Sequence, residues 1–330
     1  TGRPCRAGCF TGFVRSSIAM RKDDLASTAA LLNTVFASDP PVGVKELDWY
    51  YRANPEGEAA VGRVENGGRQ VGNYSLVPLR FDHADGTLLR LGLGVDLAVH
   101  PEARGTGTFR TTVEESYRQG MASGLDGILG VANAQSSPRM VKAMGWHLLP
   151  PLPLRILLPR PSGARVEHLL VDSDLLDGGR IYDLLPQRSR GGPAGFTATW
   201  SAELLAWRLA RPRGNYVLHV LEDLLVVSTR TSFAGLPVAV VLKSLPRHPI
   251  PEPLDCGRVA GAIAAYHHTP LVVHWGINPA VAYQGPVVPR RLQPRPLDLV
   301  LHPFTVDGSR HFDPATFIMA GFEFLDFDAY

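Results

Sequence analysis

Residues 94–109 read Gly-Val-Asp-Leu-Ala-Val-His-Pro-Glu-Ala-Arg-Gly-Thr-Gly-Thr-Phe, and they give the strongest indication of the fold class. Its first part ends a strand expected over 87–99, and its last part predicts a glycine-rich turn with a helix beginning near Thr106. A helix N-terminus carries unpaired N–H groups and partial positive charge, so it attracts anions. Gly105 and Gly107 let the backbone curl and let phosphate oxygens approach without meeting a Cβ. The stretch is therefore suited to a pyrophosphate.

The order of elements around this stretch indicates the fold class. A helix is expected from Asp23, followed by strands over 59–64 and 70–81 that meet at Asn66-Gly67-Gly68. Asn-Gly supplies the positive φ angles of a tight hairpin, so these strands and the next one are expected to form an antiparallel meander. The elements expected after the glycine turn are a helix ending at Gly124, a strand over 128–132, a helix over 137–145 and a proline-interrupted strand over 146–158.

The glycine spacing excludes two common nucleotide-binding motifs. It is shorter than a dinucleotide fingerprint, and it lacks the Gly-Lys-Ser/Thr of a P-loop. The segment instead resembles the cofactor signature of the GNAT acyltransferase superfamily, Arg/Gln-x-x-Gly-x-Gly/Ala after an apolar strand and often after His-Pro-Glu. Arg104 and Gly107 match this signature, whereas Phe109 departs from its usual small residue. The variant Arg-Gly-x-Gly-x-Phe is similar to that of two-domain members.

The resemblance covers residues 17–158 in element order and implies where an acyl-CoA would bind. Its pyrophosphate would lie on the loop formed by Arg104, Gly105, Thr106, Gly107, Thr108 and Phe109. In GNAT proteins the strand after the loop helix splays away from the preceding strand, and pantetheine lies in the gap. By that resemblance, residues 131–133 would face pantetheine, with Asn133 in contact. The backbone of Leu97, Ala98 and Val99 would bond the pantetheine amides and polarise the thioester carbonyl.

Two residues near the expected thioester are candidates for catalysis. Asp96 could deprotonate an ammonium group, directly or through water, if burial raises its pKa. Its alternative role is structural, bonded to neighbouring backbone. Ser137 could pass a proton to the departing thiolate, or it could serve only as a helix N-cap. No tyrosine lies between Gly124 and Trp146, where many GNAT enzymes carry their general acid, so the acid is not identified.

The acceptor site is expected beside the meander. Trp49, Tyr50 and Tyr74 are candidates for lining it, although aromatic residues at such spacing are more often core. The segment 322–330 is rich in aromatic residues and carries acidic residues as well. It predicts a final edge strand with exposed acids, or alternatively a segment that reaches the site.

The second half of the chain looks like a weak copy of the first. Leu205-Ala206-Trp207 followed by Pro212 repeats Leu47-Asp48-Trp49 followed by Pro55. A hairpin, a helix over 259–266 and a strand over 271–275 follow, but no Arg-Gly-x-Gly loop. We therefore expect an α/β (α+β) chain with a mixed, mostly antiparallel GNAT sheet flanked by helices. The catalytic domain would span 13–160, and a degenerate GNAT-like domain completing the acceptor site would span 161–330.

Composition narrows the function. The net charge of +2 comes from scattered arginines, so no nucleic-acid or membrane partner is expected. Three cysteines form no framework or metal knuckle, which favours a reducing, cytoplasmic compartment and no metal. The expected activity is transfer of an acyl group from acetyl-CoA or another acyl-CoA to a small-molecule amine, by a monomer or homodimer. The alternatives are a non-catalytic acyl-CoA sensor or scaffold and, disfavoured by the absent basic tract, an aminoacyl-transferase that uses tRNA.

Overall fold

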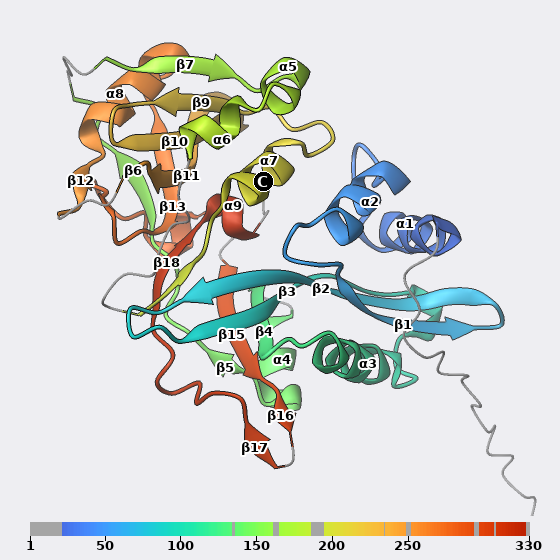
Figure 1. The fold of residues 1–330 in the computed structure, drawn as a ribbon. Coiled ribbons are helices and arrows are strands. Elements are labelled where there is room, and N and C mark those ends of the chain that lie inside the picture. Colours follow the sequence, from blue (N-terminus) through green and yellow to red (C-terminus); the bar gives the residue numbers. More distant parts are fainter. Residues whose placement is uncertain are drawn as a thin grey trace, which may run out of the picture.

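The computed structural model describes residues 22–133, 136–160, 165–185, 195–233, 235–248, 252–293, 297–306 and 308–327. Figure 1 shows two lobes joined through a shared sheet, with helices packed on it. The elements of the first half, in chain order, are α1 (Lys22–Phe36), α2 (Val44–Arg52), β1 (Ala60–Asn66), β2 (Arg69–Asp82), β3 (Leu88–Val99), η1 (Pro101–Ala103), α3 (Thr108–Ala122), β4 (Gly127–Asn133), α4 (Ser137–Met144), β5 (His147–Leu148) and β6 (Leu154–Leu157).

The second half begins with short elements and continues with a longer meander. Its elements are β7 (Glu167–Leu170), α5 (Ser173–Asp177), α6 (Arg180–Leu184), β8 (Phe196–Ala198), α7 (Ala202–Leu209), β9 (Val217–Val220), β10 (Leu224–Phe233), β11 (Leu236–Pro246), β12 (Leu254–Asp255), α8 (Gly257–Tyr266), β13 (Val272–Ile277), β14 (Val281–Ala282), η2 (Arg290–Leu292), β15 (Leu297–Pro303), β16 (Thr305–Val306), β17 (Ser309–Arg310), β18 (Met319–Glu323) and α9 (Phe324–Phe327).

One mixed sheet crosses both halves. Its strands follow the order β5-β15-β4-β3-β2-β8-β18-β13-β11-β10-β9-β7, with β1 added on β2 and β6 on β13. The pairs β3–β4, β11–β13 and β8–β18 are parallel, and the other pairs of this sheet are antiparallel. The predicted hairpin between β1 and β2 turns at Gly67 and Gly68, both with positive φ. The predicted fold class, a mostly antiparallel sheet flanked by helices, is confirmed.

The two halves repeat one arrangement. The order α2-β1-β2-β3-α3-β4 in the first half matches α7-β9-β10-β11-α8-β13 in the second. In each half an antiparallel meander is followed by a helix and by a strand parallel to the last meander strand. Trp49 and Trp207, which the sequence repeat aligns, stack 5.2 Å apart. Each indole N–H also donates to the backbone carbonyl of the other tryptophan, at 2.7 and 2.9 Å. This reciprocal contact supports an internal duplication.

The halves also exchange strands, which the sequence did not predict. Residues 146–158 were expected to form one strand of the first half. The structure instead has β5 in the first half, a proline-rich break over 149–153, and β6 paired with β13 in the second half. In return β15 pairs with β4 along its whole length and with β5 (Figure 1). Proline cannot donate to a strand ladder, so these prolines end β5 and let the chain cross over.

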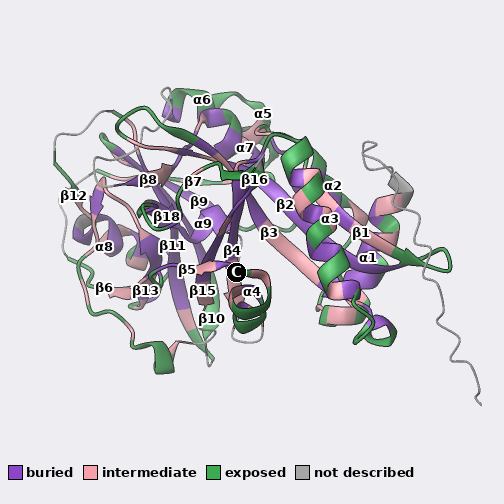
Figure 2. Ribbon diagram, turned by 90° about the horizontal axis from the view of Figure 1, so that it is seen from below, coloured by how far each residue is buried: buried purple, intermediate pink, exposed green. Residues whose placement is uncertain are grey.

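Buried side chains alternate between the two faces of the sheet. On β2, Val77, Leu79 and Phe81 belong to the apolar core that reaches α1, α2 and the second half, whereas Tyr74 and Leu76 pack toward α3 and α4. Figure 2 shows the buried residues concentrated in the sheet and on the inner sides of the helices. The alternation follows from the pleat of a strand, where successive side chains point to opposite faces. This alternation determines which side chains of the sheet can lie on the same face.

Hydrogen-bonded histidines lie inside the second half. His219 Nδ1 is 2.7 Å from His168 Nδ1, and His219 Nε2 is 2.7 Å from Ser228 Oγ. His267 Nε2 lies 2.7 Å from the same Ser228 oxygen. Burial, and then the proximity of His168, lowers the pKa of His219 to about 3. His219 is therefore neutral at pH 7 and ties β7, β9 and β10 together in that form.

This cluster predicts that acid destabilises the fold. Between pH 7.5 and 5.5 the unfolded chain binds a proton at position 219, whose ordinary pKa is about 6.5, and the folded chain does not. The free energy of unfolding should therefore fall by about 1 kcal/mol from this residue over that interval. Urea denaturation at both pH values measures the change. His219→Gln should reduce it. An equal fall in wild type and His219→Gln would refute the assignment.

Two further observations concern the described part of the chain. None of its helices combines the length and the apolar character needed to cross a lipid bilayer. Within the same residues, no three His, Cys, Asp or Glu side chains gather in a way that could hold a metal ion.

Candidate functional site

The glycine loop leads from η1 into α3 and is open. The helix begins at Thr108, two residues later than the sequence suggested, with Gly107 as its N-cap. Gly105 and Gly107 have φ angles of 80° and 87°, a region that favours glycine. A Cβ added to either would meet no atom within 4 Å. Both glycines are therefore required for the backbone conformation, and the space in front of them is free.

The loop presents a set of unused donors. No backbone N–H group from Gly105 to Arg110 donates a hydrogen bond to the described residues. The Thr106 hydroxyl donates to the Ala103 carbonyl at 2.8 Å and lies 2.9 Å from the Thr108 hydroxyl, which shapes the turn. The Arg104 side chain is exposed beside it. N–H groups at the positive end of a 15-residue helix, next to an arginine, are the groups that an anion-binding site requires.

Strands β3 and β4 diverge on the carboxyl side of their contact, as expected. They pair in parallel only between Leu91–Gly94 and Gly127–Gly130. Beyond this point β3 continues to Val99 and β4 to Asn133 without further pairing to each other. On its other edge β4 remains paired with β15 up to Asn133. Over residues 95–99, just before the loop, β3 does not pair with β4, so backbone groups of residues 97–99 can bond an extended ligand.

A β-bulge lies in this part of β3, which does not pair with β4. The register with β2 passes from Asn73 opposite Ala98 to Ser75 opposite Val95, so Asp96 and Leu97 share one position. Asp96 has a φ of 55°, and the Asn73 amide donates to its carbonyl at 3.0 Å. The bulge changes which way the following residues face, because Val95 and Ala98 pack on one core and Leu97 on the other.

The Asp96 carboxylate is held on the face that carries α2. The Tyr51 hydroxyl donates to its Oδ2 at 2.5 Å. Burial, and then the negative charge of Asp96, raises the pKa of Tyr51 well above its usual value, so Tyr51 stays protonated as a donor. A chain of side-chain hydrogen bonds from Thr28 through Gln70 to Asn73 supports the bulge from α1. No sequence signal indicated the contact between Tyr51 and Asp96, which lie 45 residues apart in the chain.

The three predicted acceptor-site residues are not brought together. Trp49 and Tyr50 are 8% and 7% exposed and pack between α2 and α7, where Trp207 stacks on both. Tyr74, 3% exposed, belongs to the core on the opposite face of the sheet. The strand pleat separates the two groups, and burial raises the pKa of Tyr74 above its usual range. A shared pocket of these three side chains is therefore a wrong prediction, and the structure gives them packing roles.

Two other predicted residues, Ser137 and Asn133, lie near the diverging strands, as does part of the segment 322–330. Ser137 is buried in the first turn of α4, but the N-cap of this helix is Ser136 and not Ser137. Asn133 is the last residue of β4 and faces Leu297 in the strand ladder. The prediction for the Asn133 side chain lies outside the described residues. Phe327, at the described end of the chain, lines a small cavity together with Val131 of β4 and Trp275.

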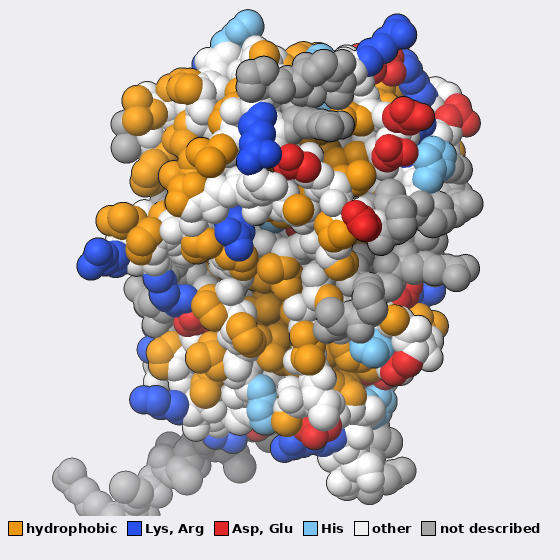
Figure 3. Space-filling model, turned by 90° about the vertical axis from the view of Figure 1, so that its left-hand side faces the viewer, with side chains coloured by type: hydrophobic (Ala, Val, Ile, Leu, Met, Phe, Trp, Pro, Cys, Tyr) orange, Lys and Arg blue, Asp and Glu red, His pale blue; other side chains and the backbone are white. Residues whose placement is uncertain are grey.

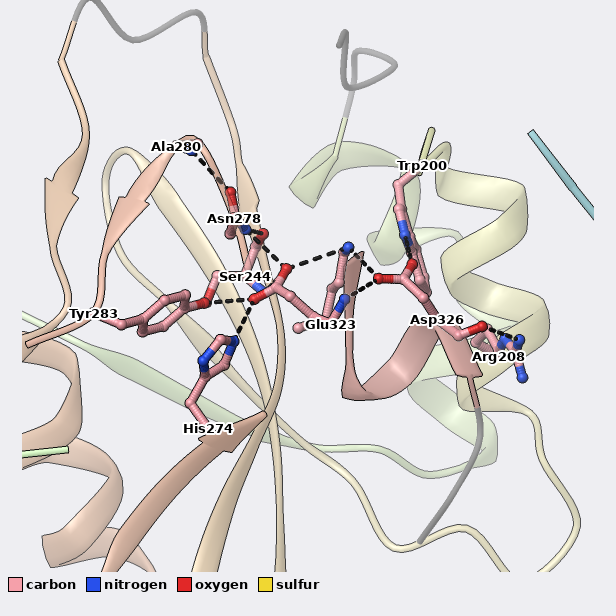
Figure 4. A network of polar contacts seen from close by, with 10 residues as sticks. Trp200, Arg208, Ser244, His274, Asn278, Ala280, Tyr283, Glu323 and Asp326 are labelled. Carbon is pink, nitrogen blue, oxygen red and sulfur yellow. Dashed lines mark hydrogen bonds and ion pairs between the residues drawn. The ribbon is translucent and has the colours of Figure 1, made fainter. Parts of the chain in front are cut away.

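The corresponding position in the second half is filled. Strands β11 and β13 pair from Ala239–Val241 to Val272–His274 and then part. The Glu323 carboxylate contacts Lys243 Nζ at 3.2 Å and His274 Nε2 at 3.1 Å, between the two strands (Figure 4). Lys243 also contacts Asp326 at 2.8 Å. Glu323 and Asp326 are fully or almost fully buried, so the expectation that these two acids are exposed is wrong.

Opposite charges in this buried cluster shift one another's pKa values. Burial opposes the charged form of Lys243, but the carboxylates of Asp326 and Glu323 outweigh it and raise the pKa of the amine. Burial likewise opposes ionisation of Glu323, yet Lys243 and His274 lower its pKa. Burial raises the pKa of Asp326, although Lys243 opposes the shift. At the start of α8 the anion position is also taken, since the Asp255 carboxylate accepts from Gly257 N–H at 2.9 Å. Within the described residues, the open loop beside diverging strands is thus a feature of the first half.

Comparison with known proteins supports the fold through structure alone. No protein-family profile and no curated protein sequence matches this chain. A probable N-acyltransferase of unknown function from Enterococcus faecalis is 11% identical, with a TM-score of 0.54 over 86% of this chain and 70% of its own. A GCN5-related N-acetyltransferase from Anabaena variabilis is 10% identical, with a TM-score of 0.55 over 85% and 70%.

N-myristoyltransferase of Saccharomyces cerevisiae, solved with bound myristoyl-CoA, is also similar. It is 11% identical, with a TM-score of 0.50 over 86% of this chain and 80% of its own. Each of these similarities extends over both halves of the chain. The chain therefore has the fold of the GNAT acyltransferases, in a form built from two related halves.

Proposed function

We propose that this chain is an acyl-CoA-dependent N-acyltransferase, which transfers an acetyl or longer acyl group to a primary amine of a small molecule. The observation that carries the proposal is the position of the open anion site directly after the part of β3 that does not pair with β4. One continuous segment thus offers donors for a pyrophosphate and, a few residues earlier, strand groups for the pantetheine amides. The structural neighbours named above, one of them bound to myristoyl-CoA, support the same co-substrate.

In this proposal the loop N–H groups and Arg104 bind the pyrophosphate of acyl-CoA. The backbone of Leu97, Ala98 and Val99 bonds the pantetheine arm and polarises the thioester carbonyl. The amine attacks the carbonyl carbon, so that a C–N bond forms and the C–S bond breaks. Asp96 accepts the proton of the amine, directly or through water, and the thiolate leaves and takes up a proton from Ser137 or from water. Holding both reactants in place supplies much of the rate.

The experiment that tests this function measures release of free thiol from acetyl-CoA and longer acyl-CoA species in the presence of a panel of small amines. Mass spectrometry of ligands that co-purify with the protein identifies the acyl chain to try first. Amine-dependent thiol release supports the enzyme. Binding of CoA without thiol release for any amine would instead favour the acyl-CoA sensor or scaffold.

Tyr51 should act as a positioning residue for Asp96 in this reaction. Tyr51→Phe removes the hydrogen bond donated to the carboxylate, and with it a stabilisation of the charged form. The acidic limb of the pH–rate profile should therefore move to higher pH, while turnover at the optimum falls by less than about tenfold. CoA affinity should not change. A loss of turnover at all pH values, with no shift of the limb, would indicate a purely structural Tyr51.

A further inference from the structure

A second cavity, unrelated to the glycine loop, opens in the second half. It measures about 380 Å³, within the usual size range of small-ligand pockets. Its walls come from β6, the end of β13, the turn that follows, and β18 with the residue before it; they include Arg155, Ile277, Tyr283, Met319 and Ala320. On β13, Trp275 lines the small cavity beside β4 whereas the next residue, Gly276, lines this one. The residues that line this cavity include none of the glycine loop or of the diverging ends of β3 and β4.

The walls of this cavity combine hydrocarbon and polar groups. Ile277, Val281, Ile318 and Met319 contribute hydrocarbon side chains. Ile318 is 61% exposed at the rim, a large exposure for a side chain of this kind. Figure 3 shows the side of the molecule on the left of Figure 1, with hydrophobic side chains gathered across its middle. A ligand in the cavity would thus meet these hydrocarbon side chains beside polar groups.

Arg155 is the single charged residue among those that line the cavity. Its Nη1 donates to the Gly285 carbonyl at 3.2 Å, and it forms no ion pair with any described residue. The segment at Gly285 is packed tightly on β6, since a Cβ there would lie 1.9 Å from the Ile156 carbonyl oxygen. The guanidinium is therefore anchored at one nitrogen, with no carboxylate from the described residues to balance its charge.

The polar groups at the base of the cavity are already satisfied. The Tyr283 hydroxyl lies 2.5 Å from Glu323 and 2.8 Å from Ser244 (Figure 4). The Asn278 amide donates to Glu323 at 2.8 Å and accepts from Ala280 N–H at 2.9 Å. Glu323 in turn contacts Lys243. These groups form a fixed floor, and Arg155 is the one charged side chain in the cavity lining itself.

We propose that this cavity binds a small monocarboxylate with an apolar body. The carboxylate pairs with the Arg155 guanidinium, whose planar fork matches two carboxylate oxygens, and the hydrocarbon part packs on the apolar walls. A phosphate dianion fits less well, because the lining supplies only one cation. This site is independent of the proposed acyl transfer.

The test uses hexanoate as the probe and hexanamide as its neutral counterpart, titrated calorimetrically into the full-length chain. Hexanoate should bind, and hexanamide should bind at least about tenfold more weakly because it lacks the charge. Arg155→Gln should weaken hexanoate by a similar factor. Arg180→Gln, which changes an exposed arginine of the same half, is the matched control and should leave hexanoate binding unchanged. Ala320→Phe, which fills the cavity and keeps Arg155, should abolish binding.

Thermal melts verify that each variant is folded, and titration with CoA should give the wild-type affinity for Arg155→Gln. Three results would overturn the proposal: no hexanoate binding to the wild type, equal binding of hexanoate and hexanamide, or hexanoate binding that survives Arg155→Gln or Ala320→Phe. A failure of CoA to bind the wild type would contradict the proposed acyl transfer. It would not affect the carboxylate site, which the hexanoate titration tests separately.

Discussion

Gly107→Val should weaken CoA binding by about 10²-fold or more. Charge-assisted hydrogen bonds contribute about 1.5–3 kcal/mol each, so displacement of the phosphates from even two loop N–H groups reaches this loss. Valine is strongly disfavoured at the φ of 87° found at this position, and its branched side chain would stand in the space in front of the loop. Calorimetric titration with acetyl-CoA measures the change.

Gly86 provides a matched control for this substitution. It has a φ of 92° in a hairpin turn, and a Cβ there also meets no atom within 4 Å. Gly86→Val therefore introduces the same kind of backbone strain at a distance from the loop. Both variants should lose stability to a similar degree, but only Gly107→Val should lose CoA affinity. Wild-type CoA affinity in Gly107→Val would remove the loop from the proposed site.

Asp96→Asn should lower turnover by roughly 10²-fold or more, the usual contribution of a general base. Asparagine has nearly the same shape and tolerates a φ of 55°, so the bulge should persist. The backbone groups of β3 that are proposed to bind pantetheine are unchanged, so CoA affinity should stay close to that of the wild type. Steady-state kinetics with the best amine of the panel, together with a CoA titration, separates the two effects.

The control for Asp96→Asn is Asp126→Asn. Asp126 accepts from the Arg90 N–H at 2.7 Å, near the opposite end of β3, and holds that end of the strand. Its substitution should affect stability more than turnover. Near-normal turnover in Asp96→Asn would give Asp96 a structural role and leave water or another group as the base.

The local elements around the loop were predictable because their signals lie in short segments. Tight turns depend on the residues that occupy them, and the hairpin at Gly67-Gly68 formed where glycines permit positive φ. The start of the helix after the loop and the end of α4 at Gly145 are likewise set by the glycines at these positions. The duplication was also visible, since Trp49 and Trp207 recur at similar places in the two halves.

The arrangement of Asp96 and Tyr51 in the proposed site was less predictable, because it depends on contacts between distant segments. Whether Asp96 faces the site depends on a bulge, and a bulge needs the register of the neighbouring strand, which Asn73 helps to fix. Tyr51 and Asp96 are 45 residues apart and meet only because α2 packs on the sheet. Likewise, the sequence predicted exposed acids near the end of the chain, whereas Glu323 is buried because Lys243 and His274 contact it from other strands.

The sequence specified the three-strand meander, the positive-φ glycine turn at residues 105–107 and the helix after it, because backbone conformation at glycines and helix starts is a local property. Only the tertiary structure decided that β6 and β15 cross between the halves, that Trp49 and Tyr50 are core, and that the second half closes its own gap with Glu323. These features follow from the packing of surfaces far apart in the chain, where burial and charge balance override local preference.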